Sequence, residues 1–239
     1  MNQAASSYLG SNSNTEPYAK PHTGLSSNTQ TEKPNTKTSG HTMSRKTTMP
    51  LVALYCGSRA GNKPVYRDHA ILLAQRLAQN NLGVVYGGAS IGLMGQVADT
   101  VLAQGGEVVG VIPAFLLQNE IAHATLTELY VVDTMHERKA MMAERASAFV
   151  ALPGGLGTFE EILEVATWGQ LAQHSKPIVL FNVQNYYQGL IDQLAHAVNE
   201  GFLSPEHCAK VVVCQTVEEV MQAIQLATQQ SGSLQTEHV

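Results

Sequence analysis

Two patterns of apolar residues alternate along the chain after residue 50. Short, mainly apolar runs have the length of strands buried on both faces, and they occupy 51–56, 82–86, 108–112, 129–132, 148–152, 176–181 and 211–214. The segments between them repeat apolar residues at spacings of three and four, which predicts helices over 64–80, 92–105, 135–146, 158–171, 186–199 and 216–225. Strands that alternate with helices predict an α/β fold: a Rossmann-like, doubly wound parallel sheet in a single domain.

The first 49 residues differ from the rest in composition. They are rich in Ser, Asn, Thr, Lys and Pro and show no apolar periodicity, so the sequence predicts a disordered polar tail over 1–49. The remaining ~190 residues are ample for one α/β core. We place this domain at 50–230 and expect 231–239 to form a frayed C-terminus.

Charge and cysteine content exclude several classes of function. The tail carries a formal charge of +3 and the remainder −8, and an acidic body argues against nucleic-acid binding, which depends on basic surface. Cys56, Cys208 and Cys214 lack CxxC spacing and predict neither a disulfide framework nor a zinc site. No segment resembles a secretory signal or reaches membrane-spanning length. We therefore expect a cytoplasmic protein with no membrane partner, no metal and no cofactor.

The most specific motif is PGGLGTFEE, which follows the predicted strand 148–152. Its glycines permit φ > 0 or a close approach of a ligand to the backbone, and they are Gly154, Gly155 and Gly157. Thr158 is expected to be the N-cap of the next helix, with Glu161 in capping-box position. The free N–H groups and the dipole of that helix favour an anion such as phosphate. An anion site alone does not explain the two carboxylates Glu160 and Glu161.

Two more turns follow predicted strands at the edge where ligands bind in parallel sheets. Gly57 and Ser58 follow the first strand, and Gly87 and Gly88 follow the second. Taken alone, the Gly57-Ser58 turn is best read as an ordinary tight turn. The glycines from position 88 onward are spaced GxxxGxxG rather than GxGxxG, and no carboxylate stands at the end of the next strand to hold a dinucleotide ribose. A mononucleotide phosphate is therefore favoured over NAD.

Three charged residues outside these turns, Glu120, Arg138 and Lys139, are candidates for either solvated surface charges or ligand contacts. On the residues alone, Glu120 is a solvated loop charge, and Arg138 and Lys139 form a solvated helix surface. Arginine also forks onto phosphate or hydroxyl oxygens, and because it is always protonated it cannot act as a general acid.

PGGLGTFEE and the segment MHERK resemble the PGGxGTxxE and MHxRK signatures of the "Lonely Guy" family, the cytokinin riboside 5'-monophosphate phosphoribohydrolases. The second glycine loop is similar to the family's YGGGxxGLMGxVA, with Ala89 where glycine is usual. The resemblance implies cleavage of the N-glycosidic bond of an N6-modified adenosine 5'-monophosphate to free base and ribose 5-phosphate. It also implies a homodimer or a multiple of one.

The resemblance assigns roles to residues. It implies that Arg138 and Glu161 are catalytic and that the substrate is bound by Gly57, Ser58, Gly87, Gly88, Glu120, Lys139, Gly154, Gly155, Gly157, Thr158 and Glu160. A carboxylate near C1' can stabilise the ribosyl cation that forms as the bond breaks. Glu161 is the first candidate for this role and Glu160 the second. Their side chains point about 100° apart on a helix, so one of the two is expected to do this work.

Three other functions compete with this hypothesis. A nucleosidase could take plain AMP or another purine nucleotide, since no pocket for an N6 substituent is legible in the sequence. A non-catalytic nucleotide or cofactor carrier could share the fold, although the pair Arg138 and Glu161 weighs against it. A lysine decarboxylase, the family's old label, ranks last, because neither Lys139 nor Lys176 comes with a recognisable pyridoxal phosphate site.

Overall fold

The computed structural model describes residues 47–117 and 122–233, with side chains as far as residue 226. The predicted disordered tail therefore lies outside the described residues, except for 47–49, and so does Glu120. The predicted frayed C-terminus is described only through Ser233, where the last helix ends.

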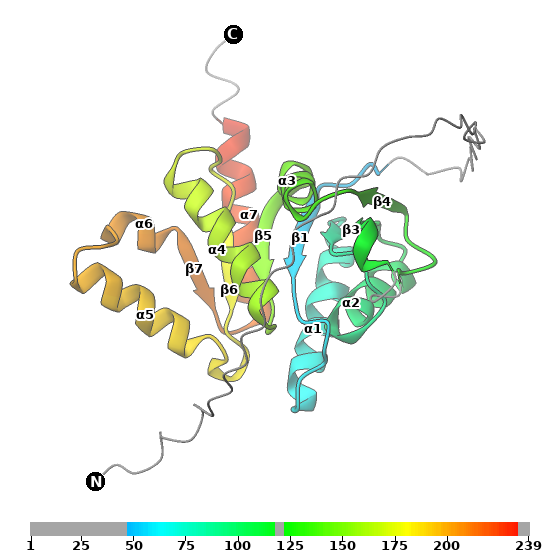
Figure 1. The fold of residues 1–239 in the computed structure, drawn as a ribbon, viewed down its shortest axis with the longest axis horizontal. Helices are drawn as coiled ribbons and strands as arrows, with labels where there is room; N and C mark the ends of the chain where they lie inside the picture. Colours follow the sequence, from blue (N-terminus) through cyan, green and yellow to red (C-terminus); the bar gives the residue numbers. More distant parts are fainter. Residues whose placement is uncertain (1–46, 118–121, 234–239) are drawn as a thin grey trace, which may run out of the picture. The chain divides into compact units, whose positions relative to one another are not determined.

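The described chain forms a seven-stranded parallel sheet in the order β4-β3-β2-β1-β5-β6-β7 (Figure 1). Its strands are β1 (Leu51–Tyr55), β2 (Gly83–Tyr86), β3 (Val108–Pro113), β4 (Glu128–Val132), β5 (Ala146–Ala151), β6 (Ile178–Phe181) and β7 (Val211–Cys214). The chain builds outward from β1 to β4 and then returns to build from β5 to β7. This order confirms the predicted doubly wound sheet, and it creates a switch point between β1 and β5, where such folds bind ligands.

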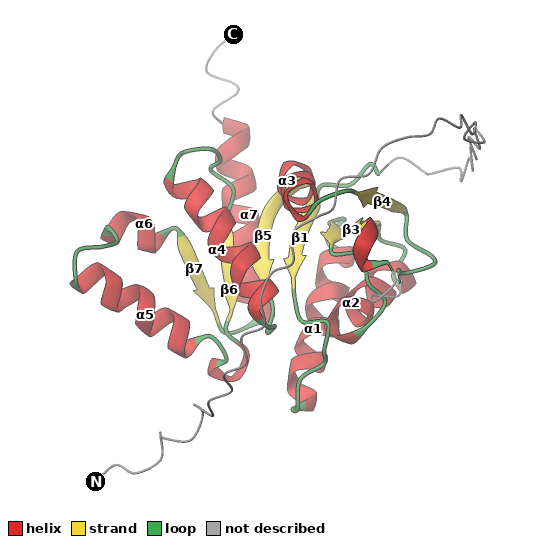
Figure 2. Cartoon of the chain, in the orientation of Figure 1, coloured by secondary structure: helices red, strands yellow, loops and turns green. Residues whose placement is uncertain are grey.

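Helices cover both faces of the sheet (Figure 2). One face carries α1 (Pro64–Gln79), α2 (Gly92–Ala103) and α7 (Val217–Ser233). The other carries α3 (Met135–Arg145), α4 (Leu156–Gln170) and α5 (Gln188–Asn199). The short α6 (Pro205–Ala209) and two 3-10 turns, η1 (Ala114–Leu116) and η2 (Val183–Asn185), complete the described elements.

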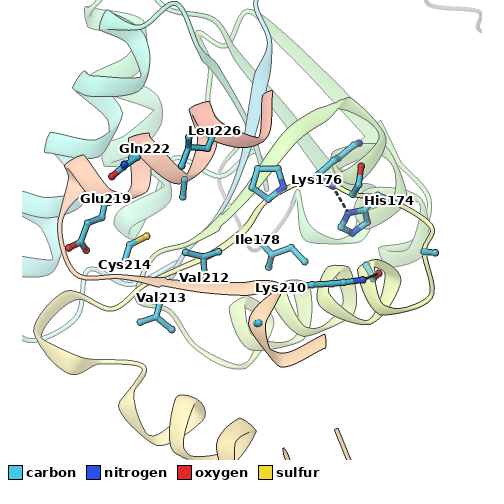
Figure 3. A pocket seen from close by; sticks show the side chains of 16 residues that line it. His174, Lys176, Ile178, Lys210, Val212, Val213, Cys214, Glu219, Gln222 and Leu226 are labelled. Carbon is cyan, nitrogen blue, oxygen red and sulfur yellow. Dashed lines mark hydrogen bonds between the residues drawn. The ribbon is translucent and has the colours of Figure 1, made fainter. Parts of the chain in front are cut away.

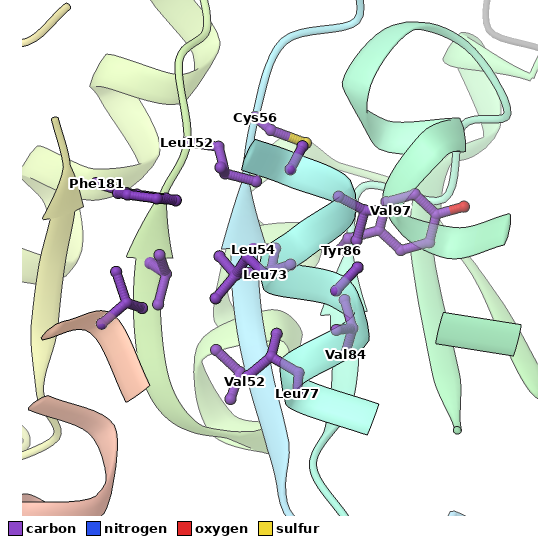
Figure 4. Close-up of a cluster of buried hydrophobic side chains, with 14 of the residues drawn as sticks. Val52, Leu54, Cys56, Leu73, Leu77, Val84, Tyr86, Val97, Leu152 and Phe181 are labelled. Carbon is purple, nitrogen blue, oxygen red and sulfur yellow. The ribbon is translucent and has the colours of Figure 1, made fainter. Parts of the chain in front are cut away.

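The period of two along each strand divides the core between these layers. Along β1, Val52 and Leu54 face the first layer, and Leu51, Ala53 and Tyr55 face the second. Figure 4 shows the first core, in which residues of α1 and α2 pack against the central strands. Helix α5 departs from the prediction, because its inward residues Leu190, Leu194 and Val198 are only half-buried and no residue of α5 is fully buried.

Residues 47–49 are held by two glutamates. The backbone N–H of Thr47 donates to Glu128 Oε1 at 2.6 Å, and its hydroxyl donates to the same atom at 2.5 Å. The N–H groups of Thr48 and Met49 donate to Glu107 Oε2 at 2.7 and 3.0 Å. Composition assigned these residues to the disordered tail, because it does not report contacts with carboxylates that lie 58 to 81 residues further along the chain.

Candidate active site

The turns at the carboxyl ends of β1 and β5 meet beside the N-termini of α3 and α4. They border a cavity of about 220 Å³. Predicted site residues that line it are Gly57, Ser58, Gly155, Gly157, Thr158, Arg138, Glu160 and Glu161. Leu54, Cys56, Met94, Met135 and Leu156 complete the lining. A second cavity of about 420 Å³ adjoins it, shares Gly57, Ser58 and Gly155, and includes Gly154, Arg59, Tyr66 and Tyr186 in its wall.

The first turn of α4 differs from the prediction in its cap. The N-cap is Gly155, not Thr158, and no side chain makes a capping hydrogen bond. Thr158 lies inside the first turn and is buried, so the predicted capping box with Glu161 is wrong. The physical reason is that the helix begins as soon as the glycine turn ends, since Phe159 N–H already bonds to Gly155 O at 3.1 Å. The N–H groups before it are left without helical partners, which suits an anion.

Space rather than positive φ requires a glycine at Gly154 of this turn. None of Gly154, Gly155 and Gly157 is among the described glycines with φ > 0. A β-carbon on Gly154 would lie 2.1 Å from Thr158 Oγ1 and 2.9 Å from Gly57 N. A β-carbon on Gly155 or Gly157 would meet no described atom within 4 Å. The turn therefore has no room for a side chain at Gly154, whereas Gly155 and Gly157 border open space that a ligand could occupy.

The loop after β2 turns sharply at Gly88 and leaves room for the Arg138 side chain at Gly87. Gly88 has φ +80°, a conformation that glycine adopts without strain, and its carbonyl accepts the N–H of His123 at 3.0 Å. Gly87 lies under the side chain of Arg138, where a β-carbon would stand 2.0 Å from Nη2. These two predicted residues do not line the cavity. Gly87 acts through the arginine that does.

Arg138 and Glu161 approach each other from two helices. Arg138 on α3 and Glu161 on α4 are both buried, with side chains 8% and 10% exposed, and Nη2 lies 3.8 Å from Oε1. The Nε of Arg138 is buried and has no hydrogen-bond partner in the described part of the chain. The guanidinium thus has a donor available for a ligand oxygen beside a carboxylate. That combination can hold ribose hydroxyls or phosphate and stabilise positive charge at a nearby carbon.

Lys139 ties α3 to α4 just beside this pair. Its ammonium donates to Glu164 Oε1 at 3.0 Å and also to Glu160 Oε1. Burial alone would lower the pKa of Lys139, but the hydrogen bonds and charges of these two glutamates outweigh it and hold the pKa above its ordinary value. The two adjacent carboxylates thus have different environments: Glu160 is half-exposed and bound to Lys139, and Glu161 is buried opposite Arg138.

The cysteine that lines the cavity, Cys56, is unreactive. Burial raises the pKa of the Cys56 thiol, and the charge of Glu161 raises it further, so this cysteine is protonated and a poor nucleophile. Among the described residues, no group of three or more His, Cys, Asp or Glu side chains could hold a metal ion. Over the same residues, no helix is long and apolar enough to cross a membrane.

A larger cavity, of about 880 Å³, lies elsewhere (Figure 3). It follows edge strand β7 and includes Lys176, Lys210 and His174. The two ammonium groups donate to backbone carbonyls of Ala143 and Gly169. It contains none of the predicted site residues, so volume alone does not identify the site.

Two tyrosines that the sequence analysis did not single out contact the glycine turn. The hydroxyl of Tyr187 donates to Leu152 O at 2.6 Å, and that of Tyr186 donates to Gly154 O. The signal was present but weak: the pair follows β6, whose carboxyl end lies at the same edge of the sheet as that of β5.

The chain is similar to proteins of known name over most of its length. A family model described as "Possible lysine decarboxylase" matches residues 94–224. The cytokinin riboside 5'-monophosphate phosphoribohydrolase LOG1 of Arabidopsis thaliana is 46% identical over 174 residues, which cover 73% of this chain and 82% of that protein. The Rhodococcoides fascians protein of the same activity name is 47% identical over 174 residues, covering 72% and 88%.

Solved structures share the architecture at lower identity. The Moco carrier protein from Chlamydomonas reinhardtii has a TM-score of 0.58 at 19% identity, covering 77% of this chain and 99% of that chain. The molybdenum cofactor binding protein from Rippkaea orientalis has a TM-score of 0.56 at 17% identity, covering 75% and 98%. At these identities the likeness concerns the fold alone.

Proposed function

Because this chain belongs to the family of cytokinin riboside 5'-monophosphate phosphoribohydrolases, we infer that it hydrolyses the N-glycosidic bond of an N6-modified adenosine 5'-monophosphate. Water adds to C1' of the ribose, the bond from C1' to the base nitrogen breaks, and that nitrogen takes up a proton. The products are the free base and ribose 5-phosphate. The observation that carries the proposal is the approach of Arg138 and Glu161 to 3.8 Å in a cavity beside the open N-terminus of α4.

The proposed division of labour follows from charge. The 5'-phosphate binds the free N–H groups at Gly155, Gly157 and neighbouring positions of the first turn, where the helix dipole favours an anion. Glu161 stabilises the ribosyl cation as the glycosidic bond breaks, because a carboxylate in a buried site interacts strongly with a developing positive charge. Arg138 binds substrate oxygens and places a positive charge 3.8 Å from the Glu161 carboxylate. It remains protonated throughout.

The resemblance also implies that Lys139 and Glu160 bind the nucleotide, but these two side chains already contact each other. Lys139 would reach a nucleotide only by sharing its ammonium, which already bonds to Glu160 and Glu164. We therefore assign Lys139 and Glu160 to the rim of the substrate site rather than to its reacting centre. Gly57 and Ser58 form the wall opposite α4.

The choice between a cytokinin nucleotide and plain AMP is tested by incubating the protein with isopentenyl-AMP and with AMP and measuring free base by chromatography. We expect a higher kcat/KM for isopentenyl-AMP, because the curated relatives carry the cytokinin activity name. Equal or better turnover of AMP would support the purine nucleotide nucleosidase instead. Binding without release of base from either nucleotide would support a carrier, and a pyridoxal absorbance band would support the decarboxylase.

We also propose that the protein forms a homodimer or a multiple of one. Support comes from α4, which exposes Leu156 (86%) at the cavity and Leu163 (38%) further along the helix. Methionine is common at adaptable interfaces, but on α3 Met142 is fully buried in the core, and Met135 and Met141 are half-buried. A monomeric mass by light scattering at micromolar concentration would contradict the dimer.

A further inference from the structure

Three consecutive carbonyls of the turn between β5 and α4 accept hydrogen bonds from two other segments of the chain. Leu152 O accepts the hydroxyl of Tyr187 at 2.6 Å, and Pro153 O accepts the N–H of Gly57 at 3.2 Å. Gly154 O accepts the hydroxyl of Tyr186. The donors come from the turn after β1 and from the segment that joins β6 to α5. The turn is therefore fixed from both sides.

Holding a carbonyl fixes the direction of an N–H group. In a trans peptide plane the C=O of one residue and the N–H of the next point in opposite directions. Tyr186, by holding Gly154 O, orients the N–H of Gly155, which is the N-cap of α4. Tyr187 holds Leu152 O, and the next residue is Pro153, which has no N–H. The two tyrosines thus differ: only the plane held by Tyr186 presents a donor.

The ring of Tyr186 is itself held in place by aromatic neighbours. It packs edge-to-face on Tyr66 of α1, with ring centroids 5.8 Å apart, and on Tyr187, with centroids 5.1 Å apart. Its other neighbour is Phe159 of α4, whose ring lies 6.4 Å away. These contacts come from helices on both faces of the sheet, and they orient the ring toward Gly154 O although Tyr186 remains 37% exposed.

The backbone before the tyrosine pair is strained. Gln184 and Asn185 both have positive φ, 52° and 57°. For glutamine this conformation is uncommon and costs energy, and such strain is found where a functional arrangement requires it. The side-chain oxygen of Asn182 accepts the N–H of Tyr187 at 2.7 Å, which closes this turn. The strained turn places both hydroxyls toward the end of β5.

We propose that Tyr186 is a positioning residue for substrate: it orients the Gly155 N–H toward the 5'-phosphate, and Tyr187 fixes the end of β5 without contributing to phosphate binding. The proposal rests on the proposed function, because that function places the phosphate at this turn. It assigns to Tyr186 a role in affinity rather than in the chemical step.

The test compares Tyr186→Phe with Tyr187→Phe, which removes the neighbouring hydroxyl and serves as the matched control. For each protein we would measure kcat and KM for isopentenyl-AMP, the Kd for ribose 5-phosphate by calorimetry, and the melting temperature. Tyr186→Phe should raise both KM and Kd by ~5- to 10-fold, the factor for the loss of one neutral hydrogen bond such as the one to Gly154 O, with kcat within about twofold. Tyr187→Phe should lower the melting temperature, since it leaves a buried carbonyl unpaired, and leave Kd within about twofold.

Three outcomes overturn the proposal. The first is an unchanged Kd and KM in Tyr186→Phe, and the second is an equal rise in both variants, which would mean that the hydroxyls only stabilise the fold. The third is an unmodified protein that neither releases base nor binds ribose 5-phosphate, which would refute the proposed function itself. If the unmodified protein turns over nucleotide and Tyr186→Phe behaves like it, only the role of Tyr186 is refuted.

Discussion

The guanidinium of Arg138 lies directly over the backbone of Gly87, so close that a β-carbon on Gly87 would stand 2.0 Å from Nη2. The two residues are far apart in sequence, on the loop after β2 and on α3. Their contact explains why this glycine belongs to the site although it does not line the cavity. The absence of a side chain at Gly87 lets the arginine settle beside Glu161.

Gly87→Ala should therefore displace the guanidinium without unfolding the protein. The nearest atom is the end of a flexible side chain, which can move, so we expect a nearly unchanged melting temperature. Nucleotide hydrolysis should fall at least ~10-fold, because Arg138 no longer reaches its position beside the substrate. Gly189→Ala on α5 is the control, since its β-carbon meets no described atom within 4 Å. A variant with normal kcat/KM would show that the position of Arg138 is unimportant.

Gly155→Ala and Gly154→Ala distinguish a glycine that leaves room for the ligand from one that leaves room for neighbouring protein atoms. At Gly155 a methyl group meets only the open cavity side, so KM should rise by roughly tenfold while the melting temperature stays the same. At Gly154 the methyl group meets Thr158 and the backbone of Gly57, so the free energy of unfolding should fall by about 1–3 kcal/mol. Thermal melts and steady-state kinetics on both variants decide. A Gly155→Ala protein with normal KM would place the phosphate elsewhere.

The N-terminal contacts predict a stability that depends on pH. Burial alone would raise the pKa of Glu128, but hydrogen bonds from Thr47 and Tyr130 and the charge of Arg145 lower it below its ordinary value. A carboxyl whose folded-state pKa is lowered stabilises the protein above its unfolded-state pKa and loses this contribution as pH falls through the folded-state pKa. A chain that begins at Met49 lacks the contacts of Thr47 and Thr48, so it should melt ~3–6 °C below one that begins at Thr47 at pH 7.

The same difference should shrink as the pH falls below the ordinary range of a glutamate and through the lowered folded-state pKa of Glu128. Glu128→Gln provides the control, because in that background the two chain starts should melt at closer temperatures at every pH. Of the predicted polar tail, only the part before residue 47 is then expected to be dispensable for stability, since Thr47 and Thr48 hold these contacts. Equal melting temperatures of the two starts at pH 7 would show that the contacts of Thr47 and Thr48 are not stabilising.

The sequence allowed us to predict the strands, the helices and the glycine turn, because these features depend on apolar periodicity and on local motifs. The seven strands and most helices were placed to within a few residues, because continuous apolar runs and helical spacing report burial directly. The prediction missed the short α6 and ended the last helix at residue 225, whereas α7 continues to Ser233. The position of the α4 cap was wrong, since Gly155 and Thr158 are both acceptable N-caps by residue type and only the backbone path distinguishes them. The glycine turn was found. Of the two reasons expected for its glycines, positive φ is wrong and a close approach of a ligand stays a prediction, while Gly154 is also required by its packing against Thr158 and Gly57.

Contacts between distant segments could not be predicted from one sequence. The bond from Tyr186 to Gly154 spans 32 residues, and that from Thr47 to Glu128 spans 81. No local pattern signals either contact, because each depends on the order of the strands in the sheet. The same holds for Lys139, whose pairing with Glu160 and Glu164 follows from how α3 lies beside α4.

The central claim is that Glu161 stabilises positive charge on the ribose in the transition state, and the kcat of Glu161→Gln tests it most directly. The substitution keeps the shape of the side chain and removes its charge, so kcat should fall by ~10²- to 10³-fold, with little change in KM because the cation exists only near the transition state. Glu160→Gln is the matched control, and its kcat should stay within about tenfold of the unmodified protein. Hydrolysis by Glu161→Gln at close to the unmodified rate would contradict the account, above all if Glu160→Gln were the variant that lost activity.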